Sequence, residues 1–143
     1  MTASLSARGV RVVRNGATLL DGIDLDVQAG ELVAVLGPNG AGKSTLLGAV
    51  AGDFELSAGS VSINGSPIVD FTPRNLARAR AVLPQQITIS FPFTVREIVA
   101  MGRGPWQDAN DDVKVEAAMQ RMDVTALASR TYQTLSVGEQ SRV

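Results

Sequence analysis

The sequence lacks cysteine and histidine altogether across its 143 residues. Without cysteine, the chain cannot form disulfides or carry out thiol chemistry. Without histidine, it lacks the commonest general base and the commonest ligand for transition metals. These two absences exclude a zinc site and a serine–histidine catalytic triad.

An excess of charge is also missing, because 13 basic and 14 acidic side chains leave a net charge of −1. This balance does not favour nucleic acid or an anionic membrane as a partner, and we predict no nucleic-acid binding. No apolar run approaches about 18 residues, so membrane association would require a partner protein. The content of 45% hydrophobic and 19% charged residues is ordinary for a globular domain with one core.

What the sequence does contain is a phosphate-binding loop at residues 37–45, which satisfies the P-loop pattern G-x-x-x-x-G-K-[ST]. The apolar run at 32–36 predicts a strand buried on both faces, and the run at 45–51 predicts a helix. In this setting, backbone N–H groups and the helix dipole surround phosphates. The residues predicted to contact the nucleotide are Gly37, Pro38, Asn39, Gly40, Ala41, Gly42, Lys43, Ser44 and Thr45.

Two of these side chains have specific predicted roles. Lys43 is placed to reach the β- and γ-phosphates, which also makes it a candidate catalytic residue. The hydroxyl of Ser44 is the expected ligand of Mg²⁺, which takes oxygen ligands and is usually shared with the phosphates of the nucleotide. The loop therefore predicts a site for a nucleotide with Mg²⁺.

The first half of the chain carries hairpin patterns around this loop. Strand-like residues from 5 to 27 flank the turn dipeptide Asn15-Gly16. A second hairpin is predicted at Asn64-Gly65, the strongest short-range hairpin signal. We therefore expect antiparallel strands on both sides of the P-loop.

The later third of the chain is predicted to be helical. The remaining predicted elements are strands at 60–63 and 66–69, a helix from Thr72 to about Arg78, a brief buried strand at 81–83, a capping box at 94–97 ahead of a helix at 98–101, and a helix from Asn110 to about Met122.

A second motif, Leu-Ser-Val-Gly-Glu-Gln, lies at residues 135–140. Ser136 and Glu139 have the spacing of a capping box, which predicts a helix N-terminus with free N–H groups. Gly138 would allow a phosphate to approach closely. Taken alone, an ordinary helix start explains the same spacing.

Together, the P-loop, Leu83-Pro84-Gln85 and residues 135–140 resemble, in order and spacing, the ATP-binding subunit of ABC transporters over the whole chain. The resemblance implies an α/β fold: a P-loop NTPase core with an N-terminal antiparallel β subdomain and a helical subdomain, truncated before the Walker B strand. The implied domain organisation is a single partial ATP-binding domain at 1–143, with the β subdomain and P-loop core at 1–84, the helical subdomain at 85–134, and the signature motif with the start of its helix at 135–143.

The same resemblance implies ATP and Mg²⁺ as cofactors and assigns three more residues. Gln85 matches a glutamine that contacts Mg²⁺ and the interface with the membrane permease subunits, and it is a catalytic candidate. Ser136 and Gly138 match signature residues that close over the ATP of the other subunit in a head-to-tail homodimer. Such a subunit would lie peripherally on the cytoplasmic face of the membrane.

The sequence departs from the family pattern in several places. Val137 stands where glycine is usual, but as a first helical residue it would need only a negative φ. Arg14 or Val13 stands where an aromatic residue stacks on adenine; the guanidinium of Arg14 can also lie flat on a base, or it can simply be solvated.

The sequence also has no apolar run followed by Asp-Glu, and no histidine. The family uses these groups to hold the metal and to position water, so we expect binding with little turnover. We therefore interpret the sequence as the N-terminal part of an ABC ATPase.

Residues 81–106 look most like haem importers, although Phe91, Phe93 and Trp106 could equally be core residues. The alternatives within transport are iron-siderophore and cobalamin importers. Outside transport, a soluble ABC ATPase of repair or translation and a catalytically inactive nucleotide-binding fragment remain open.

Overall fold

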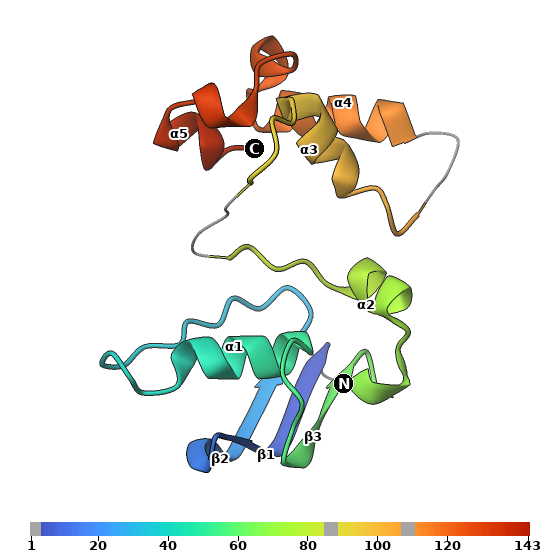
Figure 1. Cartoon of the computed structure of the whole chain (residues 1–143). Coiled ribbons are helices and arrows are strands. Elements are labelled where there is room, and N and C mark those ends of the chain that lie inside the picture. Colours follow the sequence, from blue (N-terminus) through green and yellow to red (C-terminus); the bar gives the residue numbers. More distant parts are fainter. Residues whose placement is uncertain (1–3, 85–88, 107–110) are drawn as a thin grey trace. The chain divides into compact units, whose positions relative to one another are not determined.

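The computed structural model describes residues 4–84, 89–106 and 111–143. The chain forms two compact units, Met1–Val82 and Leu83–Val143 (Figure 1). Two of the predicted residues, Gln85 and the helix cap Asn110, lie outside the described residues.

The first unit contains an antiparallel sheet with strand order β2-β1-β3-β4. Its strands are β1 (Leu5–Arg14), β2 (Ala17–Val27), β3 (Ala58–Ile63) and β4 (Ser66–Pro67).

Both predicted hairpin turns are confirmed. Asn15 and Gly16 have φ angles of 50° and 77°, and Asn64 and Gly65 have 50° and 81°. Positive φ at both central residues matches the twist of the flanking strands, which explains why Asn-Gly is favoured there. The strand predicted at 66–69, however, is shorter than expected, because a 3₁₀ turn η1 (Ile68–Asp70) follows β4 directly.

Two helices complete the first unit. Helix α1 (Lys43–Ala51) lies along one face of the sheet (Figure 1), and its buried Ala49 joins the core formed by the strands. Gly52 ends α1 in the left-handed conformation. Helix α2 (Pro73–Ala79) begins at Thr72, whose side chain accepts a hydrogen bond from the N–H of Asn75. The buried core of this unit consists of Ala7, Val10, Val12, Leu20, Ala49, Val61, Ile63 and Ile68.

The strands predicted at 32–36 and 81–83 are wrong for this structure, which has neither. Leu32 and Leu36 are 97% and 88% exposed, and Leu83 is 84% exposed. A strand exists only where a neighbour accepts and donates its ladder hydrogen bonds. Every strand pair among the described residues is antiparallel and lies in the hairpin sheet, so no described strand pairs with these runs.

The second unit is built from short helices around its own core. These are α3 (Val95–Met101), α4 (Asp111–Arg121), the 3₁₀ turns η2 (Thr125–Leu127) and η3 (Tyr132–Thr134), and α5 (Val137–Gln140). The core residues are Val95, Val115, Met119, Val124, Tyr132 and Leu135. Both predicted capping boxes, at the starts of α3 and α5, are present. None of the helices described here is long and apolar enough to cross a membrane.

The aromatic residues of this unit differ in burial. Phe91 is 68% exposed and therefore is not a core residue, and its ring centroid lies 6.0 Å from that of Phe93. Trp106 is half-buried beneath the guanidinium of Arg103, at 4.6 Å from Cζ to the ring centroid.

Candidate functional site: a phosphate-binding loop

The N-terminus of α1 differs from that of the other α-helices whose N-caps the structure describes. Its N-cap is Gly42, at φ 87°, and no side chain caps the helix. The first turn also contains no acidic residue. By contrast, α2, α3 and α5 begin at Thr72, Thr94 and Ser136, whose side chains accept a first-turn N–H. Because the first N–H groups of a helix lack helical partners, α1 presents them at the end of the glycine loop, where they suit an anion.

Lys43 closes the loop onto itself. Its ammonium Nζ donates to the carbonyl oxygen of Gly37 at 2.9 Å and to that of Pro38 at 2.7 Å. These bonds hold the positive charge over the loop beside the free N–H groups of α1. A phosphate in the loop would therefore meet a full positive charge and backbone donors together.

Gly42 is required where the loop joins the helix. A Cβ at this position would lie 3.0 Å from the carbonyl oxygen of Leu19 and 3.0 Å from Cδ2 of Leu20, both on β2. Its positive φ also disfavours any residue with a side chain. The end of the P-loop is thus packed directly against the first hairpin.

The donor set suits Mg²⁺ better than a transition metal. Among the residues that the structure describes, no group of three or more acidic, cysteine or histidine side chains could hold a metal. Ser44 is exposed and follows Lys43 in the first turn of α1, so its hydroxyl is available next to the loop. Mg²⁺ usually takes one or two protein oxygens and completes its shell with phosphates and water. The single hydroxyl of Ser44 is consistent with such a site.

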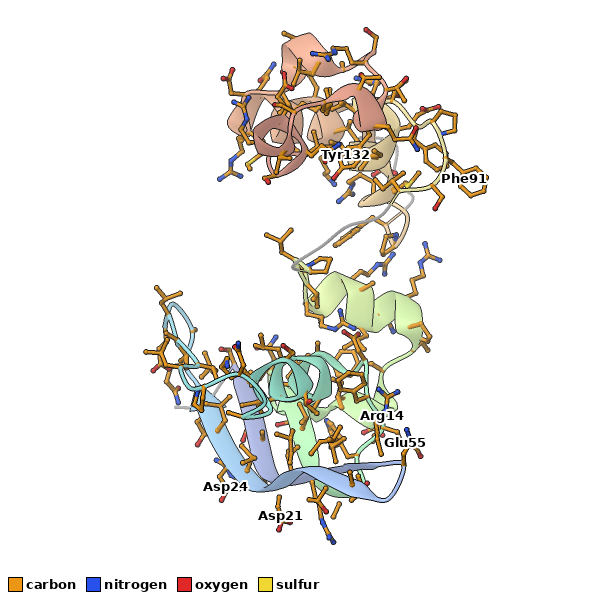
Figure 2. The ribbon with its side chains drawn as sticks, turned by 60° about the vertical axis from the view of Figure 1, so that its left-hand side comes forward. Arg14, Asp21, Asp24, Glu55, Phe91 and Tyr132 are labelled. Carbon is orange, nitrogen blue, oxygen red and sulfur yellow. The ribbon has the colours of Figure 1, made fainter. Side chains whose placement is uncertain are left out.

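Arg14 lies at the end of β1, on the same hairpin that Gly42 contacts. Its guanidinium carbon Cζ sits over the ring of Phe54, 4.8 Å from the ring centroid. Arg14 and Glu55 lie at the same end of the first unit (Figure 2), and both line a cavity of about 350 Å³. Arg14 is thus exposed but held by a contact with an aromatic ring.

Ser136 and Gly138 belong to the second unit, at the start of α5. The Ser136 hydroxyl accepts from the N–H of Glu139 at 3.3 Å, and the Ser136 N–H donates to the Glu139 carboxylate at 2.7 Å. Hydrogen bonds from the side chain and backbone of Ser136 lower the pKa of Glu139 below its ordinary value. Val137 is the first helical residue, as predicted, and a Cβ on Gly138 would meet no atom within 4 Å. The start of α5 is therefore uncrowded at Gly138, and the carboxylate of Glu139 already caps it.

The sequence profile of the ABC transporter family matches residues 20–143. The chain belongs to the ABC transporter family. It is similar to the hemin import ATP-binding protein HmuV of Nocardia farcinica, with 51% identity over 98% of this chain and 52% of that protein. The protein of the same name from Streptomyces coelicolor is 48% identical over 96% of this chain and 51% of its own length. The chain spans about half the length of these curated relatives.

Solved structures agree with this membership of the ABC transporter family. Clostridium perfringens cbiO1, part of the ABC transporter complex cbiONQ, superposes with a TM-score of 0.74 at 26% identity. The match covers 98% of this chain and 58% of the cbiO1 chain. The predicted α/β P-loop fold is therefore confirmed.

One residue beside the site of this ABC transporter chain was not predicted from the sequence. Phe54 follows the C-cap of α1, packs against Gly48 of that helix and lies under Arg14. No local pattern predicts its role, because the contact with Arg14 joins segments that are distant in sequence, and the contact with Gly48 depends on how the loop folds back onto α1. The only available signal was an aromatic residue in the short loop between α1 and β3.

Proposed function

We propose that this chain provides the ATP-binding half-site of an ABC importer that carries haem or a related iron compound. The observation that carries the proposal is the α1 N-terminus: an uncapped helix start with Lys43 fixed over a glycine loop. Such a site binds the phosphates of a nucleotide. The transported compound is inferred from relatives about half identical to this chain, which are hemin import ATP-binding proteins.

In this function each predicted residue has a defined task. Residues 37–45 hold the phosphates of ATP, Ser44 and Gln85 hold Mg²⁺, and Arg14 contacts the base. Ser136 and Gly138 contact the ATP of a second copy in a homodimer. The ATP-binding subunits would lie at the cytoplasmic face of the membrane. ATP binding and hydrolysis there would then drive transport through the permease subunits.

A chimeric protein tests the proposal in cells. Residues 1–143 replace the matching half of the Nocardia farcinica hemin import ATP-binding protein in a strain that lacks that protein. We expect growth with hemin as the only iron source. The Lys43→Ala chimera should not support growth, whereas the Lys114→Ala chimera should.

The result separates the two parts of the proposal. A chimera that binds ATP but does not support growth on hemin would overturn the haem assignment and leave the nucleotide site standing. The same strain supplied with an iron-siderophore complex or cobalamin then tests the related importers. A folded chimera that does not bind ATP would overturn the nucleotide site itself.

A further inference from the structure

The guanidinium of Arg14 rests on the side chain of Phe54. Arg14 Cζ is 4.8 Å from the centroid of the Phe54 ring, which is a cation–π contact. One face of the planar guanidinium is therefore covered by an aromatic ring, and the other face is left for a second planar group. An exposed arginine without such a support would sample many rotamers.

The ring of Phe54 is itself fixed by the helix that begins at the P-loop. A Cβ on Gly48 of α1 would lie 2.5 Å from Cε2 of Phe54, so the ring occupies the space that the missing side chain leaves. The loop that carries Phe54 is also bonded to β1: the N–H of Ser57 donates to the Arg11 carbonyl at 2.8 Å, and the N–H of Val13 donates to the Ser57 hydroxyl at 3.0 Å. Helix, loop and strand together hold the stack of Phe54 and Arg14.

The stack is linked to the P-loop through the first hairpin, because β1 carries Arg14 and its partner β2 contacts the end of the loop. Gly42, the last loop glycine, contacts β2 at Leu19 and Leu20. Across the hairpin, Leu20 pairs with Val12, and Arg14 lies two residues further along β1. Two residues of strand span about 7 Å, so Arg14 lies about that far along β1 from the residue that faces Leu20.

We infer that Phe54 is a positioning residue for base recognition: it holds the guanidinium of Arg14 so that the free face stacks on the base of the bound nucleotide. This inference rests on the proposed nucleotide site. The inference adds a condition: the base contributes to the affinity for the nucleotide through Arg14 only while Phe54 supports the guanidinium. The small residue Gly48 is needed for the same reason.

The test compares ATP with inorganic tripolyphosphate, which has the phosphates but no base, on the full 143-residue chain. Phe54→Leu removes the aromatic face and keeps an apolar side chain. We expect its Kd for MgATP to rise about 3- to 10-fold and its Kd for tripolyphosphate to stay unchanged. Arg14→Lys, at an exposed position, should give the same pattern, and Phe91→Leu in the second unit is the matched control.

A double variant shows whether Phe54 acts through Arg14. In the Arg14→Lys background, Phe54→Leu should cause no further loss of ATP affinity. Independent, multiplying losses would overturn the positioning role, as would an unchanged ATP affinity of Phe54→Leu. Equal weakening of ATP and tripolyphosphate would show that Phe54 only maintains the loop, and would also overturn the inference. If the folded parent chain binds neither ligand, the nucleotide site fails together with this inference.

Discussion

Lys43 and Lys114 are the only lysines of the chain, and they form a natural test pair. Lys43 places its ammonium over the P-loop, whereas Lys114 is exposed on α4 in the other unit. We expect Lys43→Ala to weaken MgATP binding at least about tenfold, because hydrogen bonds to charged groups are worth about 1.5–3 kcal/mol. Titration with a fluorescent ATP analogue measures the effect. Lys114→Ala should bind like the parent, and equal affinity of the Lys43→Ala variant would contradict the P-loop assignment.

Gly59 is a second residue whose substitution has a predictable cost. It has φ +84°, and a Cβ there would lie 2.3 Å from the carbonyl oxygen of Gly9, where the register of β1 against β3 shifts. We expect Gly59→Ala to lower the free energy of unfolding by more than about 1 kcal/mol, because both the backbone conformation and the clash oppose a side chain.

Denaturant unfolding followed by circular dichroism measures this cost. Gly138→Ala is the matched control, because that position is open and its φ is not positive. If both variants unfold at the parent's midpoint, the tight approach of β3 to β1 at Gly59 is wrong.

At the scale of elements, the capping boxes make part of the stability depend on pH. At the start of α3, the backbone N–H and then the side chain of Thr94 lower the pKa of Glu97 below its ordinary value of 4.5. A carboxylate with a lowered pKa stabilises the folded state above its unfolded-state pKa, and this contribution is lost as pH falls through the folded-state value. We therefore expect the second unit to lose stability as the pH falls below 4.5.

Thr94→Ala tests this link. Loss of the N-cap hydroxyl should lower stability at neutral pH by about 1 kcal/mol and should reduce the loss of stability in acid. Thermal melts between neutral pH and the acid side of the transition measure both effects. Thr125→Ala is the control, because Thr125 is exposed and its turn, η2, has no side-chain cap. A Thr94→Ala variant with the parent's full acid dependence would show that the hydroxyl of Thr94 does not contribute to the lowered pKa of Glu97.

At the scale of the whole molecule, we expect the 143-residue chain to bind ATP without hydrolysing it above background. The sequence has no histidine and no apolar run followed by Asp-Glu, so no carboxylate has the setting that orients an attacking water in this family. Binding of the phosphates alone supplies little acceleration. Phosphate release by the purified chain, compared with the hemin-importer chimera, measures the difference. Robust hydrolysis by the chain that disappears in Lys43→Ala would contradict this expectation.

The features that could be predicted from the sequence are those that depend on neighbouring residues. The Asn-Gly turns, the capping boxes and the P-loop each need only a few consecutive side chains and backbone angles. The structure therefore matches the sequence at Asn15, Asn64, Thr94 and Ser136. The family resemblance has the same origin, because its motifs are short and ordered along the chain.

Only the tertiary structure decided the features that join distant segments. The run at 32–36 has the composition of a buried strand, yet a strand forms only where a neighbouring strand supplies hydrogen bonds, and the described residues supply none. The stack of Arg14 on Phe54 and Gly48, and the approach of Gly59 to Gly9, likewise depend on how hairpin, helix and loop pack together. Composition and local spacing determine which conformation a segment prefers, but contacts between segments are set by packing in three dimensions.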